Sequence, residues 1–358
     1  MNEKTNKKII VFLINLGTPK SPSKKDIGQF LSEFLMDKRV VSLPYVLRFI
    51  LVKLIIIPFR LSKVQKIYQA VWDQNNKNNS GSPLLNNTLQ LCEKLELYLN
   101  QKNLNQKNLN PDHSNYSIQP AMTYGEPNLK TNLNKILKNI SKNNLKKIIF
   151  IPLYPQFSHT TTSAALDQIS KILPDFSEKE ADNKQFIFNE VPSVFINSYF
   201  NHPLYIQALK QSILSYQDQH GRPDLLVFSF HGLPKVNIQK GDPYLSQCEL
   251  TVKLLAESLN LKTSDYLIAF QSRVGKQAWL EPYLDQVLPR LPKEKNIKSI
   301  QIICPGFSMD CIETLEEIAL RAKELFLNAG GEKFGFIPCL NSSESQIKLL
   351  EHLILAQS

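Results

Sequence analysis

Residues Leu225–Pro234 read LLVFSFHGLP, an apolar run that ends in His, Gly and Pro. Polar residues do not alternate along the run, which is typical of a strand buried on both faces of a parallel sheet. Gly232 and Pro234 then favour a turn. We therefore expect His231 at the end of a strand, where the sheet meets its loops, and not on the surface of a helix.

Similar short runs recur along the chain and alternate with segments of helical period. This alternation predicts an α/β fold with doubly wound parallel sheets. The expected strands are Ile9–Ile14, Ile118–Thr123, Lys147–Leu153, Phe186–Val191, Leu225–His231, Tyr266–Gln271, Ser299–Cys304 and Phe334–Cys339. The expected helices include Leu129–Ile140, His202–Tyr216, Tyr244–Leu259 and Ile312–Leu327.

The two halves of the chain resemble each other. VFLINLGTPK at Val11–Lys20 is similar to VFSFHGLPK at Val227–Lys235, and PQFS at Pro155–Ser158 is similar to PGFS at Pro305–Ser308. Two similarities in the same order indicate an internal duplication. The sequence therefore predicts two similar Rossmann-like domains, each with a four-stranded parallel sheet flanked by helices.

We expect the first domain to span residues 1–200 and the second to span residues 201–358, with the last helix packing back on the first domain. The Asn-rich segments Gln74–Asn79 and Asn100–Asn115 are expected to be solvated loops without a chemical role.

The composition is that of a globular protein with a basic surface. The 358 residues are 42% hydrophobic and 21% charged, and 42 Lys and Arg against 32 Asp and Glu give a formal net charge of +10. Only seven of the basic residues are Arg, and the lysines are dispersed. This pattern favours general electrostatic attraction to anions over specific recognition of nucleic acid, so no nucleic-acid partner is expected.

The cysteines and the N-terminus favour a cytoplasmic location. The five cysteines form no C-x-x-C pair, which indicates a reducing compartment. The basic N-terminus followed by an apolar run resembles a signal peptide, but no small-x-small cleavage site follows it. A buried first strand is the favoured interpretation.

The apolar stretch Val46–Phe59 is too short to span a membrane, and either a buried helix or a helix lying in a membrane surface fits it.

Two groups of side chains follow expected strands, where ligands of open α/β sheets bind. His231 could accept or pass a proton near neutral pH, and a structural histidine is the alternative. A helix is expected to follow Ser308, which suits an N-cap. The spacing of Asp310, Glu313 and Glu317 would place all three carboxylates on one face of that helix. The row could bind a divalent cation loosely or relay protons, although acids in a first helical turn also suit the helix dipole. No G-x-G-x-x-G, Walker A or G-x-S-x-G motif is present.

Several of these segments together resemble the ferrochelatase family. They are NLGTP at Asn15–Pro19, PLYPQFS at Pro152–Ser158, SFHGLP at Ser229–Pro234, FQSRVG at Phe270–Gly275, CPGFS at Cys304–Ser308 and DCIETLEE at Asp310–Glu317. The resemblance extends in order from about Ile9 to Leu340. It implies a class II chelatase-like fold, with a porphyrin cleft between two Rossmann-like domains. It also implies a lyase that inserts ferrous iron into protoporphyrin IX to give protohaem, the terminal step of haem synthesis.

The resemblance implies roles for single residues. His231 corresponds to the active-site histidine of the family, and Glu313 to its acidic partner across the macrocycle. Asp310 and Glu317 extend the carboxylates, and these four residues are the implied metal contacts. Val46–Phe59 resembles the apolar lip through which members touch a membrane. The implied porphyrin contacts are Leu16, Arg60, Lys63, Tyr68, Ser82, Tyr124, Trp279 and Phe307, with Arg60 and Lys63 facing the propionates.

The chain departs from the family pattern in two places. Thr123 precedes Tyr124 where many members have Arg, so one polar contact of the pocket is missing. Some members hold a [2Fe–2S] cluster with a cysteine-rich C-terminal tail. Here no such tail follows, and His159 stands at the place of the remote cysteine ligand. The resemblance therefore implies Fe²⁺ as substrate, no permanently bound cofactor and no iron–sulfur cluster.

Other functions fit parts of the same pattern. A related chelatase that inserts cobalt into another tetrapyrrole would share the fold, but such enzymes usually carry more pocket histidines. A non-catalytic two-lobed binding protein and a structural membrane-associated protein leave the residues at the strand ends without a role. The sequence leaves open whether protoporphyrin or coproporphyrin is the natural substrate, whether His231 or Glu313 accepts the protons, and whether the chain is a monomer or a dimer.

Overall fold

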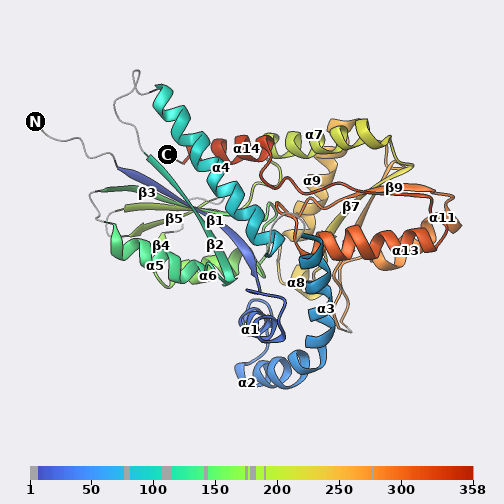
Figure 1. Ribbon diagram of the computed structural model, residues 1–358, viewed down its shortest axis with the longest axis horizontal. Coiled ribbons are helices and arrows are strands. Elements are labelled where there is room, and N and C mark those ends of the chain that lie inside the picture. Colours follow the sequence, from blue (N-terminus) through green and yellow to red (C-terminus); the bar gives the residue numbers. More distant parts are fainter. Residues whose placement is uncertain are drawn as a thin grey trace, which may run out of the picture. The chain divides into compact units, whose positions relative to one another are not determined.

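The chain folds into two α/β units (Figure 1). Unit 1 comprises Met1–Leu153, His159–Ser198 and Ser342–Ser358, and unit 2 comprises Tyr154–Ser158 and Tyr199–Asn341. The computed structural model describes residues 7–75, 81–106, 115–140, 144–173, 176–177, 183–188, 191–275 and 277–357.

The sheet of unit 1 has the strand order β2-β1-β3-β6-β5-β4. Strands β2, β1, β3 and β6 are parallel, and β5 and β4 continue the sheet in antiparallel pairing. The strands are β1 (Lys8–Thr18), β2 (Asn115–Gly125), β3 (Leu145–Pro152), β4 (Phe176–Ser177), β5 (Asn183–Phe188) and β6 (Val191–Ile196).

The expected strand Phe186–Val191 is wrong. Its place is taken by two strands, antiparallel β5 and parallel β6, so that the fourth parallel strand begins where the expected one was to end. The prediction joined apolar residues across polar Asn189 and Glu190. Pro192 concealed the true strand, because proline is rare inside strands.

Helices cover both faces of the sheet of unit 1: α5 and α6 lie on one face and α4 on the other (Figure 1). Helix α4 continues through Gln106, so the first part of the segment expected to be a loop is helical, and residues 107–114 lie outside the described part. The helices are α1 (Lys24–Leu35), α2 (Tyr45–Phe49), the π-helix η1 (Ile50–Ile56), α3 (Ile57–Asn75), α4 (Pro83–Gln106), α5 (Leu129–Asn139), α6 (Thr162–Ser170) and α14 (Glu344–Leu355).

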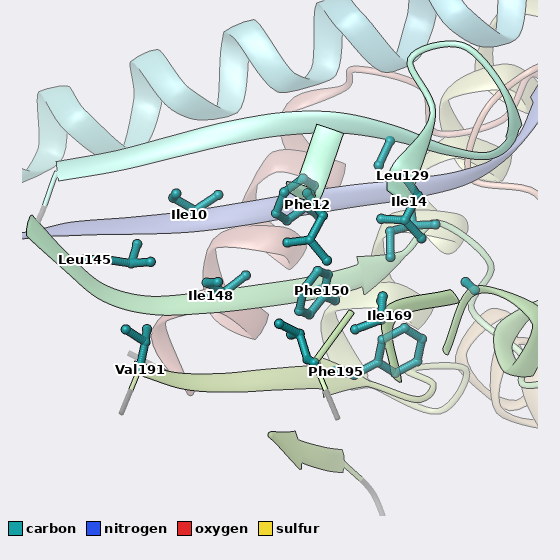
Figure 2. Close-up of a cluster of buried hydrophobic side chains, with 14 residues drawn as sticks. Ile10, Phe12, Ile14, Leu129, Leu145, Ile148, Phe150, Ile169, Val191 and Phe195 are labelled. Carbon is teal, nitrogen blue, oxygen red and sulfur yellow. The ribbon is translucent and has the colours of Figure 1, made fainter. Parts of the chain in front are cut away.

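Figure 2 shows the side chains of one core of unit 1, to which the sheet and the helices α5 and α6 contribute. Ile10, Phe12 and Ile14 point to this face from β1, as the two-residue period of a strand requires. Phe12 stacks on Phe150 of β3 with ring centroids 5.3 Å apart. The alternate residues of β1 are equally buried on the other face, which confirms the prediction of strands covered on both sides.

Unit 2 contains a purely parallel sheet with the order β10-β9-β7-β8. Its strands are β7 (Leu225–His231), β8 (Tyr266–Gln271), β9 (Ser299–Ile303) and β10 (Lys333–Phe336). One core face is closed by the segments from α10 to α13, and α7 and α9 lie over the other face (Figure 1). The helices are α7 (Pro203–His220), α8 (Lys235–Gln239), α9 (Tyr244–Leu259), α10 (Leu284–Val287), η3 (Leu288–Arg290), α11 (Leu291–Glu294), α12 (Ile312–Thr314), the π-helix η4 (Leu315–Ala322) and α13 (Lys323–Asn328).

The parallel strands of the two units follow the same topology. In unit 1 the strands β1, β2, β3 and β6 are ordered second, first, third, fourth across the sheet, and in unit 2 the strands β7, β8, β9 and β10 have the same order. This agreement supports the internal duplication and confirms the predicted α/β class of two Rossmann-like sheets. In such sheets the strand order reverses between the first and third strands, and ligands bind at the carboxyl ends there.

The last helix, α14, belongs to unit 1. Its Glu351 receives hydrogen bonds from Tyr98 Oη at 3.2 Å and Lys102 Nζ at 2.5 Å, both on α4. The chain thus returns to the first unit after Asn341, and the short segment Tyr154–Ser158 is counted with unit 2 although it follows β3.

Gly17, near the end of β1, provides a test of this fold. Its φ is +117°, and a Cβ atom there would lie 1.8 Å from the backbone oxygen of Tyr124 on the paired strand β2. We expect Gly17→Ala to prevent folding or to lower the free energy of unfolding by about 3 kcal/mol or more, through backbone strain and the clash. Urea denaturation of the purified protein measures the change.

Gly241 is the matched control, because its φ is +91° and a Cβ atom there would have no other atom within 4 Å. Gly241→Ala should cost only the conformational penalty, about 1–2 kcal/mol. Equal losses in the two variants would show that the contact between β1 and β2 is not what requires glycine at position 17.

Candidate active site

The candidate site of unit 2 lies at the carboxyl ends of β7, β8 and β9, where the strand order reverses. His231 is the last residue of β7, and it is paired in register with Gln271, the last residue of β8. The loop that follows β9 leads through Phe307 to the helix that carries Glu313. The prediction that His231 ends a strand at the sheet edge is confirmed.

The imidazole of His231 is held by a hydrogen bond of 2.7 Å between Nδ1 and the backbone oxygen of Gly232. A carbonyl oxygen can only accept, so Nδ1 carries the proton of this bond. In the neutral ring, Nε2 is then the atom with a lone pair, which suits it to accept a proton or contact a metal ion. His231 is partly exposed, so the residue is not sealed in the core.

The helix with Glu313 begins at Ile312, two residues after Asp310, and its N-cap is Cys311, not the expected Ser308. Three residues of α-helix are followed directly by the π-helix η4, which replaces the regular α-helix expected from the period. Burial raises the pKa of the Cys311 thiol well above its usual range, and the adjacent Glu313 carboxylate raises it further. The Glu313 side chain, partly exposed, is therefore next to a protonated thiol.

Asp310 lies before this helix and not on its face, contrary to the expected row of carboxylates. The side chain is buried, with 6% of its surface exposed. Its Oδ1 accepts hydrogen bonds from Thr314 Oγ1 at 3.0 Å and Cys339 N at 3.2 Å, and its Oδ2 accepts one from Asn341 Nδ2 at 2.6 Å. These bonds fix the loop after β9 to the segment after β10.

Glu317 lies in the π-helix, and its carboxylate is bound by protein donors. Oε1 accepts a hydrogen bond from the backbone N of Ser272 at 2.9 Å, and Oε2 accepts one from the Ser272 hydroxyl. Arg321 Nη1 is 3.8 Å from Oε1. Glu317 therefore ties the π-helix to the loop that follows β8, where Ser272 adopts a φ of +66°.

Two aromatic residues of the prediction flank the histidine strand. Trp279 is 8% exposed and donates from Nε1 to the Val274 oxygen at 2.9 Å. A Cβ atom on Gly232 would lie 3.3 Å from its indole ring, so the ring covers the turn directly after His231. Phe307 is partly buried against the core that β7, β8 and β9 share with η4 and α13.

The predicted residues of unit 1 form two groups. Leu16, Tyr124 and Ser82 gather where β1 and β2 end: the Tyr124 hydroxyl donates to Asp37 Oδ2 at 2.9 Å, and the Ser82 hydroxyl donates to Thr18 Oγ1 at 2.9 Å. Both hydroxyls belong to buried residues.

Helix α3 carries the second group. Arg60 and Lys63 are exposed on it, whereas Tyr68 is buried and packs edge to face on Trp72 with ring centroids 5.4 Å apart. Arg60 and Lys63 are thus available to carboxylates from solvent, as the prediction for propionate contacts requires.

The lip at Val46–Phe59 is helical and mostly exposed. Leu54 and Phe59 are 60% and 83% exposed, whereas Val52 is buried and the Arg48 guanidinium donates to the backbone oxygens of Val41 and Leu43. The alternative of a buried helix is therefore wrong. Among the described residues, no helix is both long enough and apolar enough to cross a membrane. The large exposed apolar residues of this region are Leu43, Tyr45, Val46, Leu47, Phe49, Ile50, Leu54, Ile55 and Phe59.

Sequence reasoning missed three residues at the site, namely Gln271, Ser272 and Arg321. The amide of buried Gln271 donates to the backbone oxygen of Glu313 at 2.7 Å, and Ser272 and Arg321 hold Glu317. The available signal was the position of Gln271 and Ser272 at the end of an apolar strand, the criterion that identified His231. Within the described part of the chain, no three His, Cys, Asp or Glu residues form a cluster able to hold a metal ion.

Known proteins resemble this chain over nearly its whole length. The family model of ferrochelatase matches residues 8–358. The chain is 38% identical to a ferrochelatase of Acinetobacter baumannii over 350 residues, which is 98% of this chain and 94% of that protein. It is 41% identical to a ferrochelatase of Yersinia pestis over 345 residues, or 96% of this chain and 97% of that protein. The chain belongs to the ferrochelatase family.

Members of the ferrochelatase family are lyases that insert ferrous iron into a porphyrin in haem biosynthesis, which confirms the family and the reaction class expected from the sequence motifs. A solved multi-domain protein of Deinococcus radiodurans, described as structurally similar to chelatases, matches 97% of this chain with a TM-score of 0.55 and 9% identity. The chain spans 54% of that protein. This similarity shows a chelatase-like fold.

The bonds of Asp310 predict that it stabilises unit 2. In Asp310→Asn, an NH₂ group replaces one carboxylate oxygen. It must face either the Asn341 amide or the donors of Thr314 and Cys339, so at least one buried donor loses its acceptor. We expect a loss of about 1–3 kcal/mol in the free energy of unfolding, measured by chemical denaturation.

The exchange Asp310→Asn with Asn341→Asp is the control, because it can restore each of these bonds with the two residues reversed. The stability should return close to that of the wild type. A double variant no more stable than Asp310→Asn alone would contradict the structural role of this pair.

Proposed function

We propose that this chain inserts ferrous iron into protoporphyrin IX to give protohaem, as the terminal step of haem synthesis. The observation that supports the reaction best is the pairing of His231 with Gln271 at the strand ends, with the first helical turn of Glu313 hydrogen-bonded to the same Gln271. A base and a carboxylate are thus brought to one edge of the sheet, where the family chemistry needs both.

His231 and Glu313 are the proposed catalytic residues. Metallation removes two pyrrole protons while the hydrated ion loses water, and the Nε2 lone pair of His231 suits proton acceptance. The partly exposed carboxylate of Glu313 suits contact with the arriving ion or transfer of the second proton. Asp310 and Glu317 fit direct metal contact less well, because protein donors already occupy their carboxylates.

The substrate is proposed from the surface of unit 1. Arg60 and Lys63 are exposed directly after the apolar lip, so cations lie beside a large apolar surface. A porphyrin with apolar vinyl groups and few carboxylates matches such a surface better than the more carboxylated coproporphyrin. Leu16, Tyr68, Ser82, Tyr124, Trp279 and Phe307 stay predictions as porphyrin contacts.

Anaerobic assays with ferrous ion test the substrate. We expect kcat/KM with protoporphyrin to exceed that with coproporphyrin by at least about tenfold, a difference of about 1.4 kcal/mol in transition-state stabilisation. Absorption spectra follow the conversion of free porphyrin to the metallated product. Equal or reversed values would reject protoporphyrin as the natural substrate.

His231→Ala serves as the control for the reaction in the same assay. Porphyrin binding, measured by fluorescence quenching, should persist, while turnover should fall by more than about a hundredfold, in keeping with loss of a proton acceptor. A turnover within tenfold of the wild type would refute the catalytic role of His231.

The exposed lip supports a second proposal, peripheral contact with a membrane surface. Monomeric proteins rarely expose apolar patches of this kind without a binding role, and Arg60 and Lys63 add positive charge beside it. We propose that the lip lies in the interfacial plane of a membrane with anionic lipids, on the cytoplasmic side, where five unpaired cysteines stay reduced.

Vesicle sedimentation tests the lip. Replacing Leu54 and Phe59 by Ser should weaken binding to phosphatidylglycerol–phosphatidylcholine vesicles by about tenfold or more, because each buried apolar side chain contributes about 1.5–3 kcal/mol. Activity on detergent-dispersed porphyrin should stay near that of the wild type. Leu97→Ser with Leu104→Ser is the matched control, since both leucines are exposed on α4 of the same unit. Equal binding by both double variants would exclude the lip as the membrane contact.

We also propose that the enzyme works without an iron–sulfur cluster or other permanent cofactor. Clusters are held by thiolates. Burial raises the pKa of Cys92 to about 12, and it raises the pKa values of the Cys248 and Cys304 thiols well above their usual range. Buried thiols of this kind suit packing, and within the described residues no three His, Cys, Asp or Glu side chains gather to hold a metal.

A further inference from the structure

Gln271 uses every hydrogen-bonding position of its side-chain amide. It ends β8 and is 3% exposed. Its Oε1 accepts from Ser229 Oγ at 2.6 Å and from Cys304 Sγ at 3.8 Å. Its Nε2 donates to the Glu313 backbone oxygen at 2.7 Å and lies 3.5 Å from Glu317 Oε2. The amide therefore connects β7, β9 and the helical segment that follows β9.

The orientation of this amide is fixed by its partners. The Glu313 backbone oxygen can only accept a hydrogen bond, so the NH₂ group must face it. The oxygen must then face the hydroxyl of Ser229 on β7. A buried amide with all positions paired is rigid, because any rotation leaves a buried polar group without a partner.

The backbone of Gln271 reaches the other proposed catalytic residue. Its carbonyl oxygen accepts from the backbone N of Gly232 at 2.8 Å. The oxygen of Gly232 in turn accepts from Nδ1 of His231 at 2.7 Å. Gln271 thus holds Gly232, the residue whose carbonyl orients the imidazole, and through its side chain it holds the first helical turn of Glu313.

We infer that Gln271 is a positioning residue, which sets the place of Glu313 relative to His231 and touches neither metal nor porphyrin. The inference rests on the proposed roles of His231 and Glu313 in metallation. A displacement of about 1 Å between reacting groups lowers a rate by up to about a hundredfold, so the loss of this one bond should act on turnover.

The experiment compares Gln271→Glu with the wild type, using zinc or ferrous ion and protoporphyrin. The substitution conserves volume and the acceptor for Ser229, but it places an oxygen against the Glu313 carbonyl and the Glu317 carboxylate. We expect kcat to fall by about 10- to 100-fold, while the porphyrin dissociation constant changes by less than about threefold. If Gln271→Glu does not fold, Gln271→Met is used in its place, because methionine cannot donate a hydrogen bond to Glu313.

Gln301→Glu is the matched control. Gln301 lies on β9 of the same sheet, is 4% exposed and donates from Nε2 to the Gly221 oxygen at 2.8 Å. It therefore also loses a buried amide–carbonyl bond, but its partner is not part of the site. Its kcat should stay within about threefold of the wild type at a comparable loss of thermal stability.

A double-mutant cycle separates positioning from general damage. In the Glu313→Gln background, Gln271→Glu should lower kcat by less than about threefold, because the group it positions is already lost. The inference would be overturned if Gln271→Glu lowered kcat equally in both backgrounds, or if its kcat equalled that of Gln301→Glu. With His231→Ala inactive in the same assay, the proposed function would still stand. Wild-type turnover of both His231→Ala and Glu313→Gln would overturn the proposed roles and the inference with them.

Discussion

The hydrogen bond from the Gln271 amide to the backbone of Glu313 joins the sheet of unit 2 to the helix that follows β9. Parallel strands deliver their carboxyl ends to one edge, but they do not fix the first helical turn after a long loop. Here that turn is held from β8 by Gln271, and the preceding loop is held from the segment after β10 through Asp310. The turn that carries Glu313 is therefore fixed by hydrogen bonds on both sides, while the side chains of Glu313 and His231 are partly exposed.

The duplicated topology shows how one strand end serves two purposes. In the aligned segments, Asn15 of β1 corresponds to His231 of β7. Asn15 is buried and donates to Thr88, and Gly17 allows the close approach of β2. The same position in unit 2 carries a partly exposed imidazole. The two units thus share the same strand end, which carries a packing residue in unit 1 and the proposed catalytic histidine in unit 2.

The strands and the α/β fold class were predictable because a strand buried on both faces appears in the sequence as a continuous apolar run. The bounds of β7 and β8 match the predicted ones, and the histidine at the end of β7 followed from them. The π-helix η4 was not predictable from a period of 3.6, and neither was the place of Asp310 before the helix. Both segments are hydrogen-bonded to residues distant in sequence, Glu317 to Ser272 and Asp310 to Asn341. Gln271 was quoted within a motif, but the partners that give it a role lie on three other segments.

The protonated thiols near the site have a consequence for an enzyme that handles ferrous iron. Ferrous ion and oxygen together generate peroxide, and oxidation of cysteine proceeds through the thiolate. Cys304 and Cys311 keep their protons because burial raises their pKa values and the carboxylates beside them raise these further. The carboxylates of Asp310, Glu313 and Glu317 therefore help to keep the neighbouring sulfur atoms protonated and slow to oxidise, so the chain can tolerate cysteine while it handles ferrous iron.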